Sequence, residues 1–216
     1  FPTRRSSDLV PAKAAFPNSF SYGNDAVETV SYDPDGAKKL LEESGWTDTD
    51  GDGYVDKDGQ KLSINWLTYP TRLEQPKLAE YAQATLKDIG IDVVVNNTSD
   101  HMTIAKSGDF DVYVSSTTTA PTGDPEYFFT STVTGAKNYG NYQNEEVTKL
   151  TDQLHQTFDK DERAKLAVEL QQDILDDDAF FFISHLNMGI VTKSNVTGMA
   201  AHPCDYYEIT ADLDVE

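Results

Sequence analysis

The chain has 216 residues, with 17 Lys or Arg against 37 Asp or Glu and a formal net charge of −20. This charge, and the lack of any basic stripe, argues against a nucleic-acid partner, because the phosphate backbone would be repelled. A single cysteine, Cys204, excludes an internal disulfide and a thiolate metal cluster. The 10 Phe, 11 Tyr and 2 Trp residues supply enough apolar area for one full domain or two small ones.

The N-terminal residues 1–9 read Phe-Pro-Thr-Arg-Arg-Ser-Ser-Asp-Leu. This run is similar to the translation of a common sequencing-adapter oligonucleotide, and we interpret it as an assembly scar; the alternative is a disordered basic terminus. We exclude it from fold prediction. The interpretation predicts a fragment of a longer protein. Residues 10–30, rich in Pro, Ala, Ser and Asn, are expected to form an extended lead-in.

The first half of the chain predicts alternating helices and strands. Asp33 and Pro34 suit the N-cap and the first position of a helix that ends before Gly45. Apolar periodicity then predicts a strand at 61–67, a helix at 75–89, a strand at 91–95, a short helix at 101–106 and a strand at 110–114. This order is typical of a βαβ layout with right-handed crossovers.

The second half is more helical. Amphipathic patterns predict helices at 145–158 and 161–175, which would form a hairpin covering one face of a sheet. The wholly apolar run 179–183 is expected to be a central strand, and the rest of the chain to mix short strands with turns. The fold class is therefore α/β.

Several motifs occur in an ordered set. They are Tyr32-Asp33-Pro34-Asp35-Gly36-Ala37 with the following Ser44-Gly45-Trp46, the Asp/Gly run at 48–53, Leu86-Lys87-Asp88-Ile89-Gly90-Ile91, Gly108-Asp109-Phe110-Asp111-Val112, Asp124-Pro125 and Asn138-Tyr139-Gly140. This set resembles the extracytoplasmic solute-binding proteins, family 5, of peptide and nickel ABC importers, over about residues 30 to 190.

The resemblance implies a type II periplasmic-binding-protein-like lobe, with a mixed sheet flanked by helices. Residues 31–186 would be the C-terminal lobe, and residues 187–216 a tail that crosses to an absent N-terminal lobe and exposes apolar surface. The implied partners are that lobe, ABC permease subunits and a small-molecule or peptide ligand. The implied location is extracytoplasmic, either periplasmic or as a cell-surface lipoprotein.

The loop after the strand at 110–114 is the main ligand-binding candidate. Its hydroxyl residues Thr117, Thr118, Thr119 and Thr122 could hydrogen-bond a polar ligand. In peptide-binding members of the family, this loop carries an Asp that pairs with the peptide's α-amino group, and the matching position here is Pro121. The resemblance therefore favours nickel or a metal chelate over a short peptide, although neither subfamily's pattern fits fully and a solvated loop remains an alternative.

Histidines are the candidate ligands for a transition metal, since neutral imidazole suits nickel, copper and zinc. His185 follows the apolar run, and His202 stands in the tail. Either could touch a metal or a chelate, or have a structural role. His101 is expected to be a loop or helix-start residue, and His155 a surface residue of the helix at 145–158.

An Asp/Gly loop suggests calcium. Asp48, Asp50 and Asp52 match the opening of a calcium loop, where carboxylates converge on a hard cation, and Asp56 stands at its ninth position. Gly59 stands where a bidentate Glu is expected, so any affinity would be weak. The second functional hypothesis is accordingly a small calcium-binding interaction module. No G-x-S-x-G, H-E-x-x-H or phosphate loop occurs, and we predict that the protein is not an enzyme.

Overall fold

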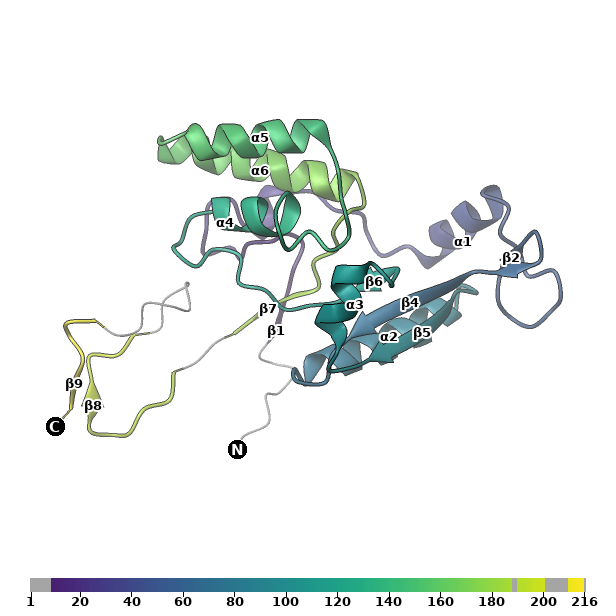
Figure 1. Cartoon of the computed structure of the whole chain (residues 1–216), viewed down its shortest axis with the longest axis horizontal. Helices are drawn as coiled ribbons and strands as arrows, with labels where there is room; N and C mark the ends of the chain where they lie inside the picture. Colours follow the sequence, from purple (N-terminus) through teal and green to yellow (C-terminus); the bar gives the residue numbers. More distant parts are fainter. Residues whose placement is uncertain (1–8, 188–189, 201–209, 216) are drawn as a thin grey trace. The chain divides into compact units, whose positions relative to one another are not determined.

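A computed structural model of the chain describes residues 9–187, 190–200 and 210–215 (Figure 1). The chain divides into two compact units. One consists of Val30–Ser116, and the other combines Phe1–Thr29 with Thr117–Glu216.

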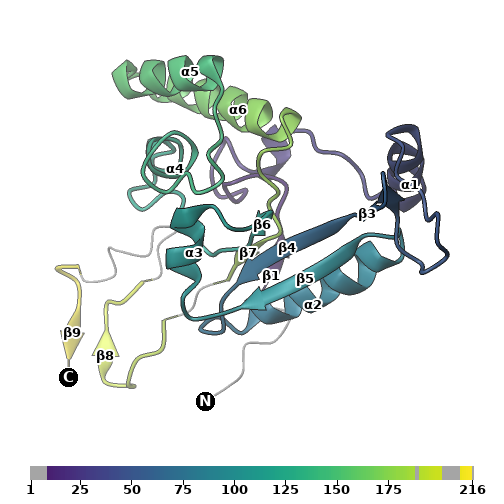
Figure 2. The same cartoon turned by 45° about the vertical axis from the view of Figure 1, so that its right-hand side comes forward.

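The unit Val30–Ser116 is built on a parallel sheet. Its strands β4 (Ser63–Thr68), β5 (Asp92–Asn97) and β6 (Val112–Tyr113) lie in the order β5-β4-β6. Helix α2 (Glu74–Lys87) connects β4 to β5, and α3 (His101–Ser107) connects β5 to β6. Figure 2 shows β4 and β5 side by side, with α2 running along them. The predicted βαβ layout is confirmed.

The start of this unit follows local signals. Helix α1 (Pro34–Glu43) begins at Pro34, and the Asp33 carboxylate accepts a hydrogen bond from the Gly36 N–H at 2.9 Å, as the capping prediction requires. The short strands β2 (Asp56–Lys57) and β3 (Gln60–Lys61) form a hairpin after α1. None of the α1 residues is buried, and Leu40 is 64% exposed.

The second unit contains the predicted helical hairpin, α5 (Glu145–Gln156) and α6 (Lys160–Asp176), with α4 (Glu126–Phe128) and a π-helical turn η3 (Phe129–Val133). The expectation that the hairpin covers a sheet face is wrong. Its buried side chains pack instead on an aromatic cluster that includes Phe16, Phe128 and Phe129. Aromatic side chains each bury a large apolar area, so a cluster of rings can form the core on which the hairpin packs.

Residues 10–30 contribute to the core of this unit. Strand β1 (Leu9–Pro11) pairs with β7 (Ser184–Leu186), a short helical turn η2 spans Asn24–Ala26, and Phe16 is fully buried. The buried Gln171 amide accepts a hydrogen bond from the Ala15 N–H and donates one to the Tyr22 carbonyl, at 3.1 and 2.9 Å. The segment is therefore tied to α6 along its length.

The central strand expected at 179–183 is absent, because this run serves the aromatic cluster. Phe180 and Phe182 both lie 5.9 Å from Phe128 between ring centroids, whereas Phe181 is 82% exposed. The only strand nearby is β7, which pairs with β1 alone among the described strands. The apolar run at 179–183 is therefore not a buried strand. Phe180 and Phe182 pack against other rings, and Phe181 between them faces solvent.

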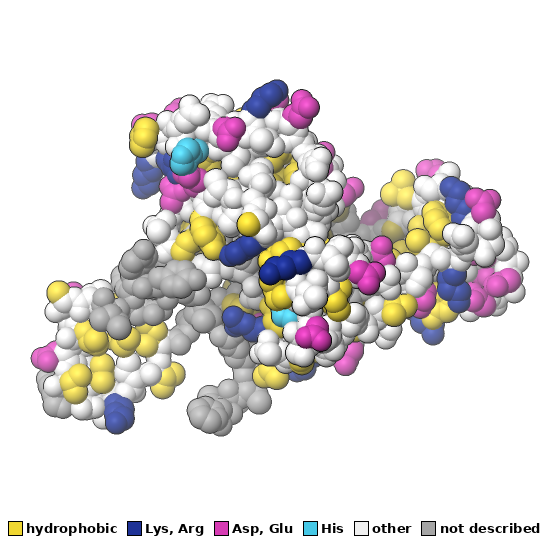
Figure 3. Space-filling model, in the orientation of Figure 1, with side chains coloured by type: hydrophobic (Ala, Val, Ile, Leu, Met, Phe, Trp, Pro, Cys, Tyr) yellow, Lys and Arg dark blue, Asp and Glu magenta, His cyan; other side chains and the backbone are white. Residues whose placement is uncertain are grey.

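In the described tail, β8 (Val196–Thr197) pairs antiparallel with β9 (Asp214–Val215). Hydrophobic side chains gather on the segment that carries these strands (Figure 3), and Val191 and Val215 are 96% and 64% exposed. The assignment of residues 187–216 to a tail that crosses to another lobe stays a prediction. None of the described helices combines the length and apolarity needed to cross a bilayer.

Candidate functional site

The candidate ligand loop begins at one edge of the parallel sheet. Strands β4, β5 and β6 end at Thr68, Asn97 and Tyr113, so their carboxyl ends meet at the same edge. Ligands of open parallel sheets bind beyond these carboxyl ends. The loop 115–123 follows β6 directly and carries the predicted hydroxyl residues.

The loop's hydroxyls are available to a ligand. Thr118 and Thr119 are half-buried, and Thr117 and Thr122 are exposed. None of the four side chains hydrogen-bonds another residue in the part of the chain that the structure describes. Pro121 is half-buried and adds neither charge nor an N–H donor.

Arg163 anchors the end of this loop, and the sequence patterns gave no indication of it. Its guanidinium donates to both carboxylate oxygens of Asp124, at 2.6 and 2.9 Å, and to Glu126 at 2.9 Å. It also donates to the carbonyls of Leu154 and Thr157, at 2.6 Å each. All five N–H groups are used, so the loop's end is held against the α5–α6 turn.

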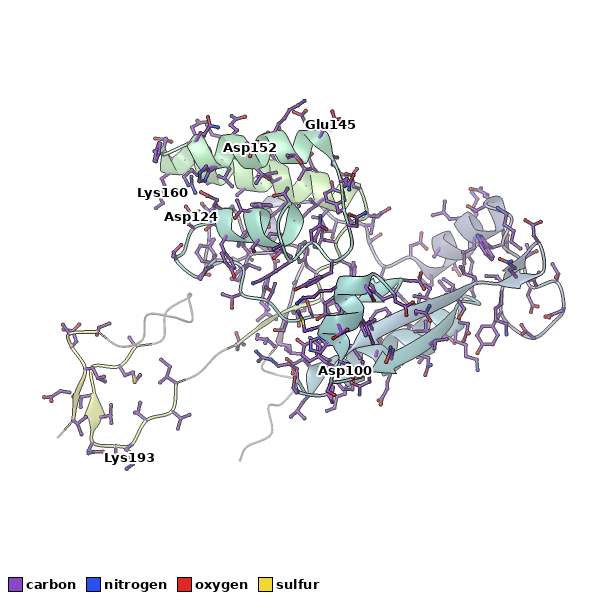
Figure 4. All side chains as sticks on the ribbon, in the orientation of Figure 1. Asp100, Asp124, Glu145, Asp152, Lys160 and Lys193 are labelled. Carbon is purple, nitrogen blue, oxygen red and sulfur yellow. The ribbon has the colours of Figure 1, made fainter. Side chains whose placement is uncertain are left out.

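This ion network shifts the acidity of its members. The His155 imidazole, 2.6 Å from Glu126, lowers the pKa of that carboxyl together with Arg163. Asp124 and Glu126 line a cavity of about 630 Å³ that also borders Lys160. Figure 4 labels Asp124 and Lys160 at this end of the helical hairpin. Because Arg163 has no N–H left to donate, we assign the network a structural role.

His185 lies in β7 and is held by Asn24. Its Nε2 lies 3.0 Å from the Asn24 Oδ1, which also accepts the backbone N–H groups of Lys13 and Ala14. An amide oxygen only accepts, so Nε2 carries the proton and donates. Burial lowers the pKa of His185. A metal or ligand contact by this side chain would therefore use Nδ1. His202, the other predicted imidazole, lies outside the described residues.

The acidic loop brings together three of its four predicted carboxylates. Oxygen atoms of Asp48, Asp50 and Asp56 lie within 4.8 Å of one another. Asp52 is separate, because it pairs with Lys61 at 2.5 Å, and Lys61 lowers its pKa.

Most of these carboxylates already accept hydrogen bonds from backbone N–H groups of the loop. Asp48 accepts the N–H groups of Gly51 and Gly53, and Asp56 accepts the backbone N–H and the hydroxyl of Thr49. These bonds define a tight polar turn without a cation. Calcium binding by the loop stays a prediction.

Comparison with known proteins identifies the family. The model of the bacterial extracellular solute-binding proteins, family 5 middle region, matches residues 7–140. The oligopeptide-binding protein AppA of Bacillus subtilis is 30% identical over 200 residues, 89% of this chain and 37% of AppA. The nickel-binding periplasmic protein of Escherichia coli is 27% identical over 201 residues, 89% of this chain and 38% of that protein. The chain thus spans under two fifths of the length of these relatives.

Solved structures agree in fold. AppA from Bacillus subtilis in complex with a nonapeptide superposes with a TM-score of 0.74 at 25% identity, covering 92% of this chain and 41% of AppA. NikA from Staphylococcus aureus in complex with Ni(L-His)2 superposes with a TM-score of 0.75 at 25% identity. This match covers 97% of this chain and 43% of NikA. These neighbours confirm the type II periplasmic-binding-protein-like fold, and the family comprises transport components rather than enzymes. The chain belongs to the family 5 bacterial extracellular solute-binding proteins.

Proposed function

We propose that this chain is a ligand-binding lobe of the substrate-binding component of an ABC importer. Residues 31–186 form its C-terminal lobe and residues 187–216 cross to an N-terminal lobe that closes on the ligand. The observation that carries the proposal is the hydroxyl-rich loop 115–123, which follows β6 in the sequence from the carboxyl end of that parallel strand, in a family 5 chain. Such a protein acts through its different affinities in open and closed states and makes no bond.

The ligand we propose is nickel held as a metal chelate, with a short peptide as the alternative. Pro121 offers no carboxylate to a peptide's amino group, while the threonine hydroxyls suit the polar rim of a chelate. The net charge of −20 also raises the local concentration of cations. Relatives of both kinds exist, one solved with a nonapeptide and one with Ni(L-His)2.

The partners we propose follow from this role. They are ABC permease subunits, which receive the ligand, and the N-terminal lobe of the same protein. The family is extracellular by description and one relative is periplasmic by name. We accordingly propose an extracytoplasmic location, either periplasmic or as a surface lipoprotein.

Calorimetry on the full-length protein, with both proposed lobes, tests the ligand class. Ni(L-His)2 should bind more tightly than a mixture of short peptides. Pro121→Asp should raise the affinity for peptides with a free α-amino group and leave N-acetylated peptides unchanged. A wild-type preference for peptides that this substitution does not alter would contradict the proposed ligand.

A calcium-binding module is the second candidate, because three carboxylates converge in the acidic loop. It would require no importer and no second lobe. Calcium binding with no response to nickel chelate or peptide would favour it.

A further inference from the structure

Three aromatic rings meet at the carboxyl edge of the sheet in the unit Val30–Ser116. Tyr69 follows the end of β4, His101 opens α3 beyond the end of β5, and Tyr113 is the last residue of β6. The three strands are parallel, so these residues come to one edge. The periodicity of the sequence predicted only a short helix at His101, without a role for its side chain.

The His101 ring is fixed in orientation by Tyr69. The two rings stack with centroids 4.1 Å apart and an interplanar angle of 21°. Tyr69 is itself only 7% exposed, and its phenol oxygen accepts the Ser116 backbone N–H at 3.1 Å. A buried, hydrogen-bonded ring is a rigid support, so the imidazole on it is preorganised.

The proton positions follow from the groups around Tyr113. Its phenol donates to the Met102 Sδ at 3.8 Å, and its oxygen lies 2.8 Å from the His101 Nδ1. The tautomer with the proton on Nδ1 satisfies both contacts, because the Nδ1–H of His101 then donates to the phenol oxygen while the phenol donates its single proton to the sulfur. Neutral His101 then presents Nε2 as a lone pair, and the described residues provide no hydrogen bond to it.

This arrangement has the chemistry of a metal ligand. A metal-binding histidine usually donates its other ring N–H to an oxygen, which sets the tautomer and the ring's direction. Imidazole nitrogen suits late first-row transition metals, and the adjacent Met102 adds a thioether on a side chain 39% exposed. A peptide N–H could also donate to Nε2, but it would make no use of the thioether.

We propose that His101 Nε2 binds a late first-row transition-metal ion, free or within a chelate, with Met102 beside it and Tyr113 as the positioning residue. The proposal rests on the proposed function, because it names the contact that this lobe makes with its ligand. Its place at the carboxyl edge matches where an open parallel sheet receives a ligand.

Titration of the full-length protein, with both proposed lobes, with NiCl2 and with Ni(L-His)2 tests the proposal. His101→Gln should weaken binding at least tenfold, and Tyr113→Phe, which keeps the ring, should weaken it about tenfold. The control His155→Gln changes an imidazole on α5 whose side chain is 71% exposed, and it should leave the affinity unchanged. Thermal unfolding of each variant shows whether it is folded.

A second readout uses the wild-type chain and needs no variant. Zn²⁺, a diamagnetic probe, should shift the ¹⁵N resonance of His101 Nε2 and leave that of His155 in place. Unchanged nickel affinity in folded His101→Gln, or an unmoved His101 resonance, would overturn the proposal while leaving the importer role intact. Binding of peptides alone would also overturn the proposed metal contact. A protein that binds neither metal, chelate nor peptide would contradict both this proposal and the proposed function.

Discussion

Arg163 and Asp124 form a two-point ion pair, with hydrogen bonds of 2.6 and 2.9 Å between the guanidinium and the two carboxylate oxygens. The pair joins the end of the candidate ligand loop to the turn between α5 and α6. The remaining N–H groups of Arg163 satisfy Glu126 and two backbone carbonyls. One side chain therefore fixes where a long polar loop ends.

Removing this anchor should destabilise the fold. Arg163→Met leaves the carbonyls of Leu154 and Thr157 without their donor and Asp124 without its cation, and we expect a loss of about 2 kcal/mol in the free energy of unfolding. Lys165→Met, on the same helix, breaks an exposed pair with Glu162 and should leave the free energy of unfolding nearly unchanged. Urea unfolding measures both, and equal losses would show that Arg163 is no anchor.

Gln171 is a buried polar link, at 0% exposure, between α6 and the segment that follows β1. Gln171→Leu keeps the volume but strands the Ala15 N–H and the Tyr22 carbonyl, so we expect a loss of about 2–3 kcal/mol. Gln153→Leu, at an exposed position of α5, should change the stability by less than about 0.5 kcal/mol. The midpoints of denaturant unfolding measure both changes. If Gln171→Leu leaves the stability unchanged, the Ala15 N–H and the Tyr22 carbonyl find other hydrogen-bond partners.

The pKa of His185 gives a pH dependence of defined sign. Burial lowers this pKa in the folded chain from its ordinary value of 6.5, so the unfolded chain binds the proton first as the pH falls. His185 thus disfavours folding progressively below about pH 6.5. His185→Gln, which can still donate to Asn24, should flatten the stability profile between pH 6.5 and pH 5. Thermal unfolding across this range would contradict the assignment if both profiles kept the same slope.

Calcium binding by the acidic loop should be weak, with a Kd of about 1 mM, because position 12 lacks a bidentate Glu. Asp48→Asn should abolish it, since Asp48 belongs to the converging group. Asp52→Asn should leave it nearly unchanged, because Asp52 pairs with Lys61 instead. Calorimetric titration with CaCl2 measures all three proteins, and binding that depends on Asp52 but not Asp48 would refute this geometry.

Elements with local signals could be predicted from the sequence. Asp33 and Pro34 mark the start of α1 through capping chemistry that acts within one turn. The alternation from β4 through α2 to β5 follows from apolar periods in neighbouring residues. The resemblance of the motifs to the family predicted the type II lobe, whereas apolar periodicity alone predicted only the order of helices and strands.

Long-range partners could not be predicted in this way. Strands β1 and β7 pair across most of the chain, and the burial of Phe16 among distant rings depends on tertiary packing. The apolar run at 179–183 suggested a strand because strands and ring-lined segments share the same composition. Similarly, the stacking of His101 on Tyr69 joins residues from two different connections of the sheet.

The most direct test of the binding role is calorimetric titration of the full-length protein, with both proposed lobes, with Ni(L-His)2 and with a short-peptide mixture, for the wild type and for the double variant Thr118→Val, Thr119→Val. Thr148→Val, whose hydroxyl bonds the Asn144 carbonyl on α5, is the control. We expect saturable binding of the nickel chelate, weakened about tenfold or more by loss of two hydrogen bonds in the double variant and unchanged in the control. No saturable binding of either ligand, or equal affinity in all three proteins, would contradict a binding role for this loop.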